Sequence, residues 1–250
     1  MRAIIIGAGR GSRLVLTTGD APKCFAEIRG KRILDWTLDA LRGGGCTEIV
    51  FIGGYRIDSV RREYPEFIFR ENKDWANNNI LVSLMCAEDL MDRPFVTSYS
   101  DILFTQEVVR GLVDSKDELA LGIDTDWREH YKPRTQHPPH DAEKAITRGG
   151  KVERVYRTIP YDEATGEFIG VAKFGPKGAR QFRDFYQRRK AEFWDKPYRE
   201  AAIFQKAYLI HMFQDMIEQG IPFGHADTPG KYREIDTQED MNLAQTLWEP

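Results

Sequence analysis

The chain has 250 residues, which is enough for one large α/β domain with an ample core. It carries 36 Lys and Arg against 39 Asp and Glu, and this net charge of −3 argues against a general nucleic-acid binder. We find no apolar run long enough to span a membrane and no signal-peptide pattern at the N-terminus. The three cysteines are odd in number and widely spaced, so we expect reduced thiols in a cytoplasmic protein.

The first segment predicts a buried strand that leads into a glycine-rich loop. Four apolar residues, Ala3–Ile6, precede a run in which glycine alternates with other residues: Gly7, Ala8, Gly9, Arg10, Gly11 and Ser12. Glycine has no Cβ, so such a loop lets backbone N–H groups approach a polyphosphate closely. Arg13 and Lys23 would then supply two cations for the phosphate oxygens. An ordinary glycine-rich turn between a strand and a helix explains the glycines alone equally well.

Strand-like and helix-like segments alternate through the first half of the chain. The apolar spacing predicts helices over 33–41, 57–64, 80–91 and 108–113, and strands over 48–52, 67–69, 94–101 and 119–123. This alternation predicts an α/β fold with a parallel sheet covered by helices, and a ligand at the carboxyl ends of the strands.

The second half is less regular. The segment 130–140 holds three prolines and three histidines, and we interpret it as a lid or surface loop rather than a metal site, because prolines break any regular face. A hairpin is expected over 145–157, a strand over 168–174, helices over 179–193 and 198–219, and a short strand at 234–236. A last helix over 237–247 would be capped by Thr237, with Asp240 three residues on.

Two aspartates stand where strands end. Asp101 follows an apolar strand, and Asp236 follows a short strand 135 residues later. Two carboxylates are a sufficient protein contribution to a Mg²⁺ site. Each aspartate also has a simpler explanation, because either could cap a turn or favour a helix N-terminus.

The loop resembles a known signature. Gly9–Leu14, a spacer of seven residues and then Pro22-Lys23 are similar to the pattern Gly-x-Gly-[Ser/Thr]-Arg-Leu…Pro-Lys of the nucleotidyltransferases that make nucleotide-activated sugars and alcohols. The segment Glu234–Asp240 resembles the family's Glu-Ile-Asp-[Ser/Thr]-x-x-Asp element. The resemblance implies a single GT-A-like domain over residues 1–250, in which a Rossmann-like, mostly parallel sheet is flanked by helices and a small inserted β element forms the acceptor pocket. It also implies that Arg13 and Lys23 are catalytic and that Asp101 and Asp236 hold Mg²⁺.

A second element narrows the subfamily. Asn79 and Ser83, one helical turn apart, resemble the Asn-x-x-x-Ser-Leu element of choline-phosphate cytidylyltransferases and their phosphonate-using relatives. That resemblance makes Asn79, Ser83 and Ser100 candidates for nucleotide binding. Helix capping is the alternative interpretation of the asparagine.

The resemblance extends to the acceptor side. Arg157 occupies the place of a basic residue that holds the acceptor phosphate, and Glu167, Gly170 and Lys173 belong to the strand that lines the acceptor pocket in the family. The alternation of the strand could equally turn Lys173 to the opposite, solvated face. If the acceptor were phosphocholine, a cage for its quaternary ammonium would be needed. The candidates for that cage are Trp127, Tyr131, Tyr161 and Glu167.

The resemblance therefore predicts a CTP- and Mg²⁺-dependent cytidylyltransferase that acts on phosphocholine or on an aminoalkyl or hydroxyalkyl phosphonate and releases pyrophosphate. The alternatives are a sugar-1-phosphate nucleotidyltransferase that uses UTP, GTP or dTTP, and a nucleotide-sensing subunit without turnover. The expected partners are CTP and the acceptor, without nucleic acid or membrane; the sequence leaves a homodimer open.

Overall fold

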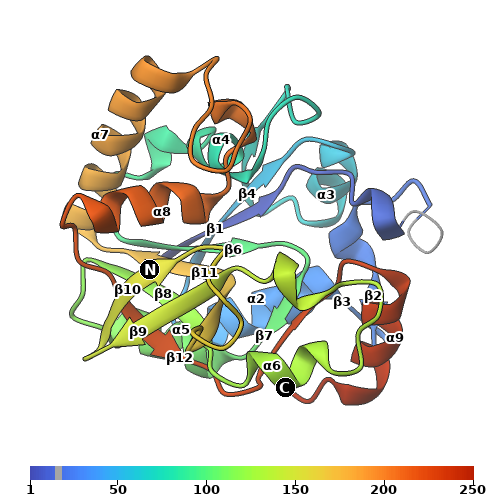
Figure 1. Ribbon diagram of the computed structural model, residues 1–250. Helices are drawn as coiled ribbons and strands as arrows, with labels where there is room; N and C mark the ends of the chain where they lie inside the picture. The colour runs from blue at the N-terminus through green and yellow to red at the C-terminus, as the bar shows by residue number, and fades with distance from the viewer. Residues whose placement is uncertain (15–18) are drawn as a thin grey trace.

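The computed structural model describes residues 1–14 and 19–250, and a central mixed sheet organises it (Figure 1). The described residues form nine strands in this sheet. Their order across the sheet is β5 (Ile68–Glu71), β4 (Glu48–Gly53), β1 (Arg2–Gly7), β6 (Phe95–Tyr99), β11 (Gly166–Phe174), β8 (Leu119–Asp124), β12 (Gly224–Asp227), β10 (Lys151–Val155) and β9 (Lys144–Arg148). Two small pairs lie outside it: β7 (Ile102–Phe104) with β13 (Tyr232–Glu234), and β2 (Glu27–Ile28) with β3 (Lys31–Arg32).

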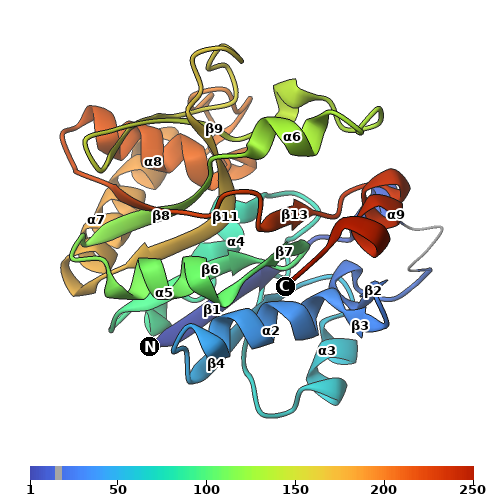
Figure 2. The same cartoon turned by 90° about the horizontal axis from the view of Figure 1, so that it is seen from below.

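Helices cover both faces of the sheet, as the α/β prediction requires (Figure 2). The helices of the described residues are α2 (Ile33–Gly43), α3 (Ile57–Glu63), α4 (Ile80–Met85), α5 (Gln106–Asp114), α6 (Trp127–Tyr131), α7 (Pro176–Phe193), α8 (Leu209–Glu218) and α9 (Gln238–Leu247). None of them is long and apolar enough to cross a membrane.

Strand β1 shows why this half of the sheet is parallel and central. It lies parallel to β4 on one side and to β6 on the other. Its successive side chains enter two different hydrophobic cores. Ile4 and Ile6 belong to the core that includes α4, α7 and α8. Ala3 and Ile5 belong to the core that includes α2, α3 and α5. A strand with helices on both faces is apolar without alternation, which matches the isoleucine run in the sequence. The carboxyl ends of β1 and β6 therefore meet at one edge.

The second half of the sheet is mixed. Strand β11 lies antiparallel to both β6 and β8, and β9 and β10 form the predicted hairpin. The β9 strand pairs with β11, so the strands β11, β8, β12, β10 and β9 close into a ring. Gly170 marks the bend, with φ of +80°: the residues after it pair with β6, and those before it pair with β9. A single strand thus links the β1–β6 half to the hairpin.

One predicted helix is much shorter than expected. Residues 198–208 hold only a 3₁₀ turn at Phe204–Lys206, and the helix α8 begins at Leu209. Four side chains of this irregular segment are buried at intervals of three residues, and they are Tyr198, Ala201, Phe204 and Ala207. Arg199, with φ of +55°, interrupts any helix there. This spacing of buried residues is close to that of one helix face, although the segment is not helical. The helix predicted over 80–91 likewise divides into α4 and a 3₁₀ turn at Glu88–Leu90.

The bend at Gly170 gives a test of the fold. A Cβ built on Gly170 would lie 2.4 Å from Cδ2 of Tyr99, whereas one on Gly150, with φ of +76°, would meet no atom within 4 Å. Both Gly→Ala changes add left-handed backbone strain of roughly 1–2 kcal/mol. Only Gly170→Ala also overlaps a ring, so its loss of unfolding free energy should exceed that of Gly150→Ala by about 1–3 kcal/mol in urea denaturation. Equal losses for the two variants would contradict the close packing at Gly170.

Candidate active site

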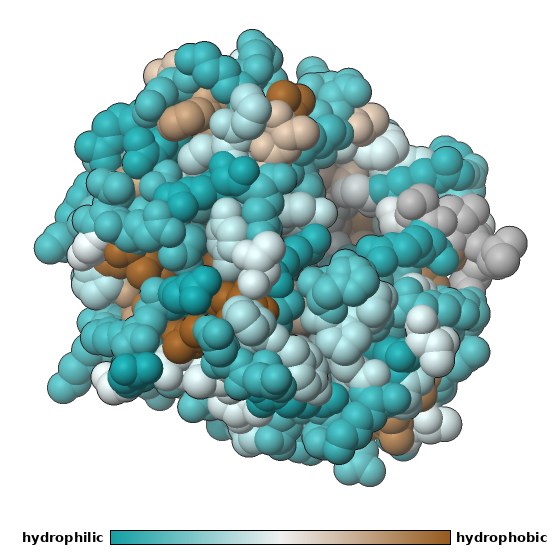
Figure 3. Space-filling view, viewed as in Figure 1, coloured by the Kyte–Doolittle hydropathy of each residue, from teal (hydrophilic) through white to brown (hydrophobic). Residues whose placement is uncertain are grey.

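A cavity of about 410 Å³ opens at the carboxyl ends of β1 and β6. It extends from the glycine-rich loop to the β9–β11 region, and its lining includes residues of both halves of the chain. Hydrophilic side chains cover most of the molecular face seen in Figure 3. The predicted location of a ligand at these strand ends therefore coincides with a real cavity.

The glycine loop forms one wall of this cavity. Gly7, Ala8, Gly9 and Gly11 line it. Gly11 has φ of +67°, and a Cβ there would lie 2.7 Å from Cδ of Lys23, so the glycine lets the lysine stem pack directly on the backbone. Ser12 begins the 3₁₀ turn Ser12–Leu14.

The side chain of Arg10 does not take part in the cavity wall. Arg10 is not among the residues that line the cavity, so only its backbone N–H is left for the nucleotide contact that we expected. Its guanidinium lies 5.4 Å from the centroid of the Tyr55 ring, in cation–π contact with it.

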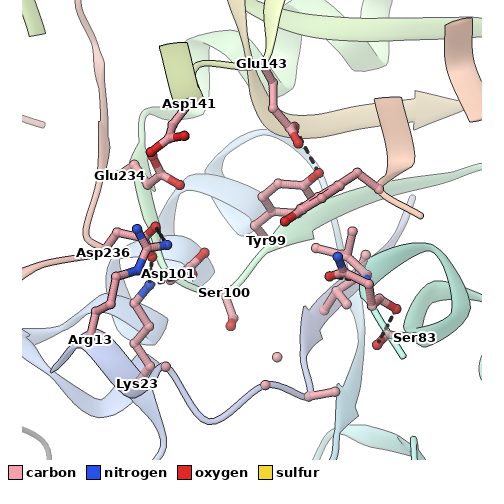
Figure 4. Close-up of a pocket in the computed structure, with 18 of the residues that line it drawn as sticks. Arg13, Lys23, Ser83, Tyr99, Ser100, Asp101, Asp141, Glu143, Glu234 and Asp236 are labelled. Carbon is pink, nitrogen blue, oxygen red and sulfur yellow. Dashed lines mark hydrogen bonds and ion pairs between the residues drawn. The ribbon is translucent and has the colours of Figure 1, made fainter. Parts of the chain in front are cut away.

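The centre of the site is a buried ammonium group between two carboxylates (Figure 4). The Nζ of Lys23 donates to Oδ2 of Asp101 at 2.7 Å and also to Asp236, which receives a further bond from Arg13. Burial disfavours the charged ammonium, but the attraction of Asp101 and Asp236 outweighs it and raises the pKa of Lys23. Burial would raise the pKa of Asp236, but Lys23 and Arg13 lower it. Lys23 and Asp236 are therefore charged at neutral pH.

The fold brings Asp101 and Asp236 together from distant parts of the chain. The strand β13 pairs antiparallel with β7, and the backbone N–H of Ile235 donates to the carbonyl oxygen of Asp101 at 3.0 Å. The predicted cap of the last helix is confirmed: Thr237 and Asp240 form a capping box at the start of α9. The Asp240 carboxylate also accepts from the backbone N–H of Asp236 at 3.1 Å, so the cap fixes the aspartate beside Lys23.

Two further potential ligands lie next to Asp236. One ligand atom of each of His137, Glu234 and Asp236 lies within 4.8 Å of the others. The Nδ1 of His137 is buried without a hydrogen-bond partner among the described residues, and it lies 3.5 Å from Oε2 of Glu234. Imidazole and carboxylate groups can both hold a divalent cation. The sequence patterns assigned no role to either His137 or Glu234, and only the Glu-Ile-Asp element offered a signal.

The segment that we interpreted as a loop or lid is tied to the last helix. The backbone N–H groups of Thr135 and Gln136 donate to Glu239 on α9, at 2.7 and 2.9 Å. The Nε of Arg134 donates to Oδ1 of Asp240 at 2.7 Å. The segment thus carries His137 to the edge of the cavity.

Asn79 and Ser83 both line the cavity, on the side of the α4 N-terminus. The Asn79 side chain acts as the N-cap of α4: its Oδ1 accepts from the N–H of Ile80 at 2.9 Å, and its Nδ2 donates to the carbonyl of Lys206 at 3.1 Å. The Ser83 hydroxyl accepts from Nδ2 of Asn72 at 2.9 Å. Asn79 therefore caps the helix, as the alternative interpretation held, and it also lines the cavity.

The residues predicted for acceptor binding divide into two groups. Arg157 and Glu167 line the cavity, as does Ser100, which we had assigned to the nucleotide. The Arg157 guanidinium lies 4.0 Å from the centroid of the Tyr208 ring and 3.5 Å from a carboxylate oxygen of Glu143. We had assigned no binding role to this glutamate, which also lines the cavity.

Gly170 and Lys173 are not among the lining residues. The Nζ of Lys173 donates to the carbonyl oxygen of Ser115, away from the cavity, as the opposite-face alternative implies. Gly170 acts through the Tyr99 ring, for which it leaves space. Direct acceptor contact was therefore the wrong interpretation of these two residues.

The Asp240 cap gives a test with a defined pH dependence. Burial would raise the pKa of Asp240, but the neighbouring His137 ring, the charge of Arg134 and the hydrogen bonds from Thr237 lower it. The stability from this carboxylate is therefore complete above its ordinary pKa of 3.8 and is lost as the pH falls through the lowered value. We expect Asp240→Asn to lose about 3 kcal/mol of unfolding free energy at pH 7. In urea denaturation, the difference in unfolding free energy between Asp240→Asn and the unmodified protein should become smaller below pH 4. The control Asp162→Asn, at an exposed position, should change the unfolding free energy little.

The comparisons with known proteins agree with this geometry. The family model of the MobA-like NTP transferase domain matches residues 3–138. The CTP:phosphoglutamine cytidylyltransferase of Campylobacter jejuni is 30% identical over 254 residues, which cover 97% of this chain and 98% of that protein.

Solved structures share the fold at low sequence identity. The inositol-1-phosphate CTP transferase from T. maritima superimposes with a TM-score of 0.73 and 21% identity, covering 100% of this chain and 98% of the other. The CTP:phosphocholine cytidylyltransferase from Streptococcus pneumoniae does so with a TM-score of 0.74 and 18% identity, covering 98% and 97%. The resemblance inferred from the sequence is thereby confirmed: the chain is a nucleotidyltransferase that belongs to the MobA-like NTP transferase family.

Proposed function

We propose that this protein is a cytidylyltransferase that transfers CMP from CTP to a small phosphorylated or phosphonate acceptor and releases pyrophosphate. The observation that carries the proposal is the Lys23 ammonium, which Asp101 and Asp236 hold at the wall formed by the glycine loop. The choice of CTP is supported by the relative that matches along nearly the whole chain and that is named for CTP and a phosphorylated amino acid.

In this reaction an acceptor oxygen forms a bond to the α-phosphorus of CTP while the bond from that phosphorus to the bridging oxygen breaks. The electron pair leaves with pyrophosphate. Phosphates and phosphonates are already ionised at neutral pH, so the acceptor needs no general base. The enzyme therefore has to position two anions and stabilise the developing charge.

The position of each residue in the cavity suggests which part of the substrates it would contact. Lys23 and Arg13 would stabilise the α-phosphate and the leaving pyrophosphate, and the backbone N–H groups of the loop from Gly9 to Ser12 would hold the β- and γ-phosphates. On the other side, Arg157 would draw in the acceptor anion. Ser83, Ser100 and Asn79 are the proposed nucleotide contacts, although Asn79 would have to exchange one of its present hydrogen bonds.

The donor set fits a divalent cation, which we propose to be Mg²⁺. Asp101 and Asp236 converge on one cationic atom, Nζ of Lys23, so both carboxylates already point at a common centre of positive charge. They are hard oxygen donors of the kind that Mg²⁺ prefers. When bound there, the ion would neutralise charge on the phosphate oxygens.

Replacement of the central lysine tests the site. Lys23→Met should lower kcat by roughly 10²–10³, because a buried charge directed at the transition state is lost. The matched control is Lys132→Met, whose ammonium is exposed and pairs only with Glu129 among the described residues. Circular dichroism and thermal unfolding should show that the Lys23 variant is folded. A folded Lys23 variant with near-normal turnover would refute the proposed role.

The substrate class is tested by pyrophosphate release with Mg²⁺, in which CTP, UTP, GTP and ATP are each combined with phosphocholine, 2-aminoethylphosphonate, 2-hydroxyethylphosphonate and glucose-1-phosphate. We expect turnover with CTP and with one or more of the phosphonates or phosphocholine. Turnover confined to UTP or GTP with the sugar phosphate would replace the proposal with a sugar-1-phosphate nucleotidyltransferase.

A further inference from the structure

A buried imidazole at the cavity wall has a ring nitrogen without a hydrogen-bond partner. The His137 side chain lines the cavity, and the residue is only 3% exposed. Its Nδ1 forms no hydrogen bond with any group in residues 1–14 and 19–250. A buried polar atom that stays unpaired is costly, so this nitrogen is a candidate ligand for a group that enters the cavity.

Two carboxylates flank this nitrogen, and their hydrogen bonds differ. Oδ2 of Asp240 lies 3.8 Å from Nδ1, but it already accepts from the backbone N–H groups of Asp236 and Thr237 and from the Thr237 hydroxyl. Oε2 of Glu234 lies 3.5 Å from Nδ1, and the Glu234 carboxylate accepts no hydrogen bond from the described residues. In the imidazole tautomer with its proton on Nε2, unused lone pairs of the nitrogen and of this oxygen face each other.

The separation of these two atoms fits two ligands of one metal ion better than a hydrogen bond. Charge-assisted N–H···O bonds are about 2.7–2.9 Å long. Two ligands that bind one tetrahedral ion at about 2.0–2.2 Å lie roughly 3.4 Å apart. The observed 3.5 Å between Nδ1 of His137 and Oε2 of Glu234 agrees with the second value.

Asp236 offers a third ligand. One ligand atom of each of Asp236, His137 and Glu234 lies within 4.8 Å of the others. The Asp236 oxygens are bonded to Lys23 and Arg13, and the Arg13 side chain is 56% exposed, so the arginine can release its oxygen to a metal ion. All three ligand residues line the cavity, so the remaining coordination positions would be open to water or to a phosphate oxygen.

The surrounding contacts hold the imidazole and the glutamate in place. Nη2 of Arg134 donates to the carbonyl oxygen of Glu234 at 2.9 Å, while Nε of the same arginine donates to Oδ1 of Asp240 at 2.7 Å. The Tyr131 ring meets the His137 ring edge-on, with the ring centroids 5.9 Å apart. Ligands that are fixed before the ion arrives need little rearrangement to bind it.

The donor set differs from that of the proposed magnesium centre. Asp101 and Asp236 offer oxygen ligands only, as Mg²⁺ prefers, and Asp101 is not a member of the group around His137. An imidazole nitrogen together with carboxylates favours a first-row transition-metal ion such as Zn²⁺ or Co²⁺. Three protein ligands with an open position are also typical of zinc sites that bind a substrate.

We infer that His137, Glu234 and Asp236 form a second cation site, which binds a divalent transition-metal ion of the Zn²⁺ class without help from a nucleotide. Asp236 would be shared between this site and the magnesium centre. The segment 130–140 supplies only one of the ligands, which is why the spacing of its histidines gives no metal pattern. Because all three ligands belong to the chain, the inference does not depend on CMP transfer.

The test measures metal binding instead of turnover. The 250-residue chain, without an affinity tag, is stripped of metal with EDTA and titrated with Co²⁺ in the absence of nucleotide and in the presence of millimolar Mg²⁺. Visible absorption and isothermal titration calorimetry follow the binding. We expect one equivalent of Co²⁺ to bind with the absorption of a nitrogen-ligated ion, and Zn²⁺ to displace it.

Variants of the ligands then locate the ion. His137→Ala should weaken Co²⁺ binding by at least roughly 10- to 100-fold, because the loss of a group that only orients a metal ligand already costs that much. Glu234→Gln keeps the shape of the side chain and should act in the same direction, so the inference stays testable if His137→Ala does not fold. The matched control is His140→Ala, in the same segment but with a side chain that is 79% exposed, and it should bind Co²⁺ like the unmodified protein. Circular dichroism checks that each variant is folded.

Three results would overturn the inference. The first is unchanged Co²⁺ affinity in folded His137→Ala or Glu234→Gln. The second is the absence of bound Co²⁺ in millimolar Mg²⁺, which would leave His137 and Glu234 as a buried ion pair. The third is loss of Co²⁺ binding in Asp101→Asn together with its retention in His137→Ala, which would assign the ion to the magnesium centre. Since no nucleotide is present, each result is independent of the CMP-transfer assay.

Discussion

The structure depends on the contact between the Lys23 ammonium and the carboxylates of Asp101 and Asp236. It joins the loop after β1, the end of β6 and the segment after β13, which are far apart in sequence. A buried lysine needs such partners, because removing one member of a buried ion pair typically costs about 3–5 kcal/mol. The same arrangement keeps the lysine charged and places it beside a loop that can receive phosphate. Folding and the phosphate binding that we propose would thus use the same charges.

The two ends of the cavity are lined by different ionisable groups. Around the glycine loop, cations and N–H groups face the position that we assign to the triphosphate. In the inserted β element, the Glu143 and Glu167 carboxyl groups accept hydrogen bonds from the Tyr99 and Tyr131 hydroxyls, and burial raises the pKa of both. Arg157 lies between these roles, 3.5 Å from Glu143 and with its guanidinium over Tyr208.

The sequence predicted the parts of the fold that local patterns encode. The isoleucine run of β1, the glycine loop and the Thr237–Asp240 cap are all local, and each lies where we expected it. Failures arose where distant contacts decided the outcome. Residues 198–208 bury apolar side chains at intervals of three without a helix, and Arg10 turns to Tyr55 instead of the cavity. His137 and Glu143 could not be found from spacing, because only the docking of the 130–140 segment against α9 and the pairing of β9 with β11 carry them to the site.

The bend of β11 at Gly170 has a consequence for how this architecture changes over evolution. Before the bend the strand belongs to the hairpin ring, and after it the strand belongs to the sheet that supports the phosphate loop. Substitutions in the hairpin can therefore remodel one end of the cavity while the other end keeps its framework. The two structural neighbours share this fold. A single glycine thus lies at the boundary between the part of the strand that pairs with the hairpin and the part that pairs with β6.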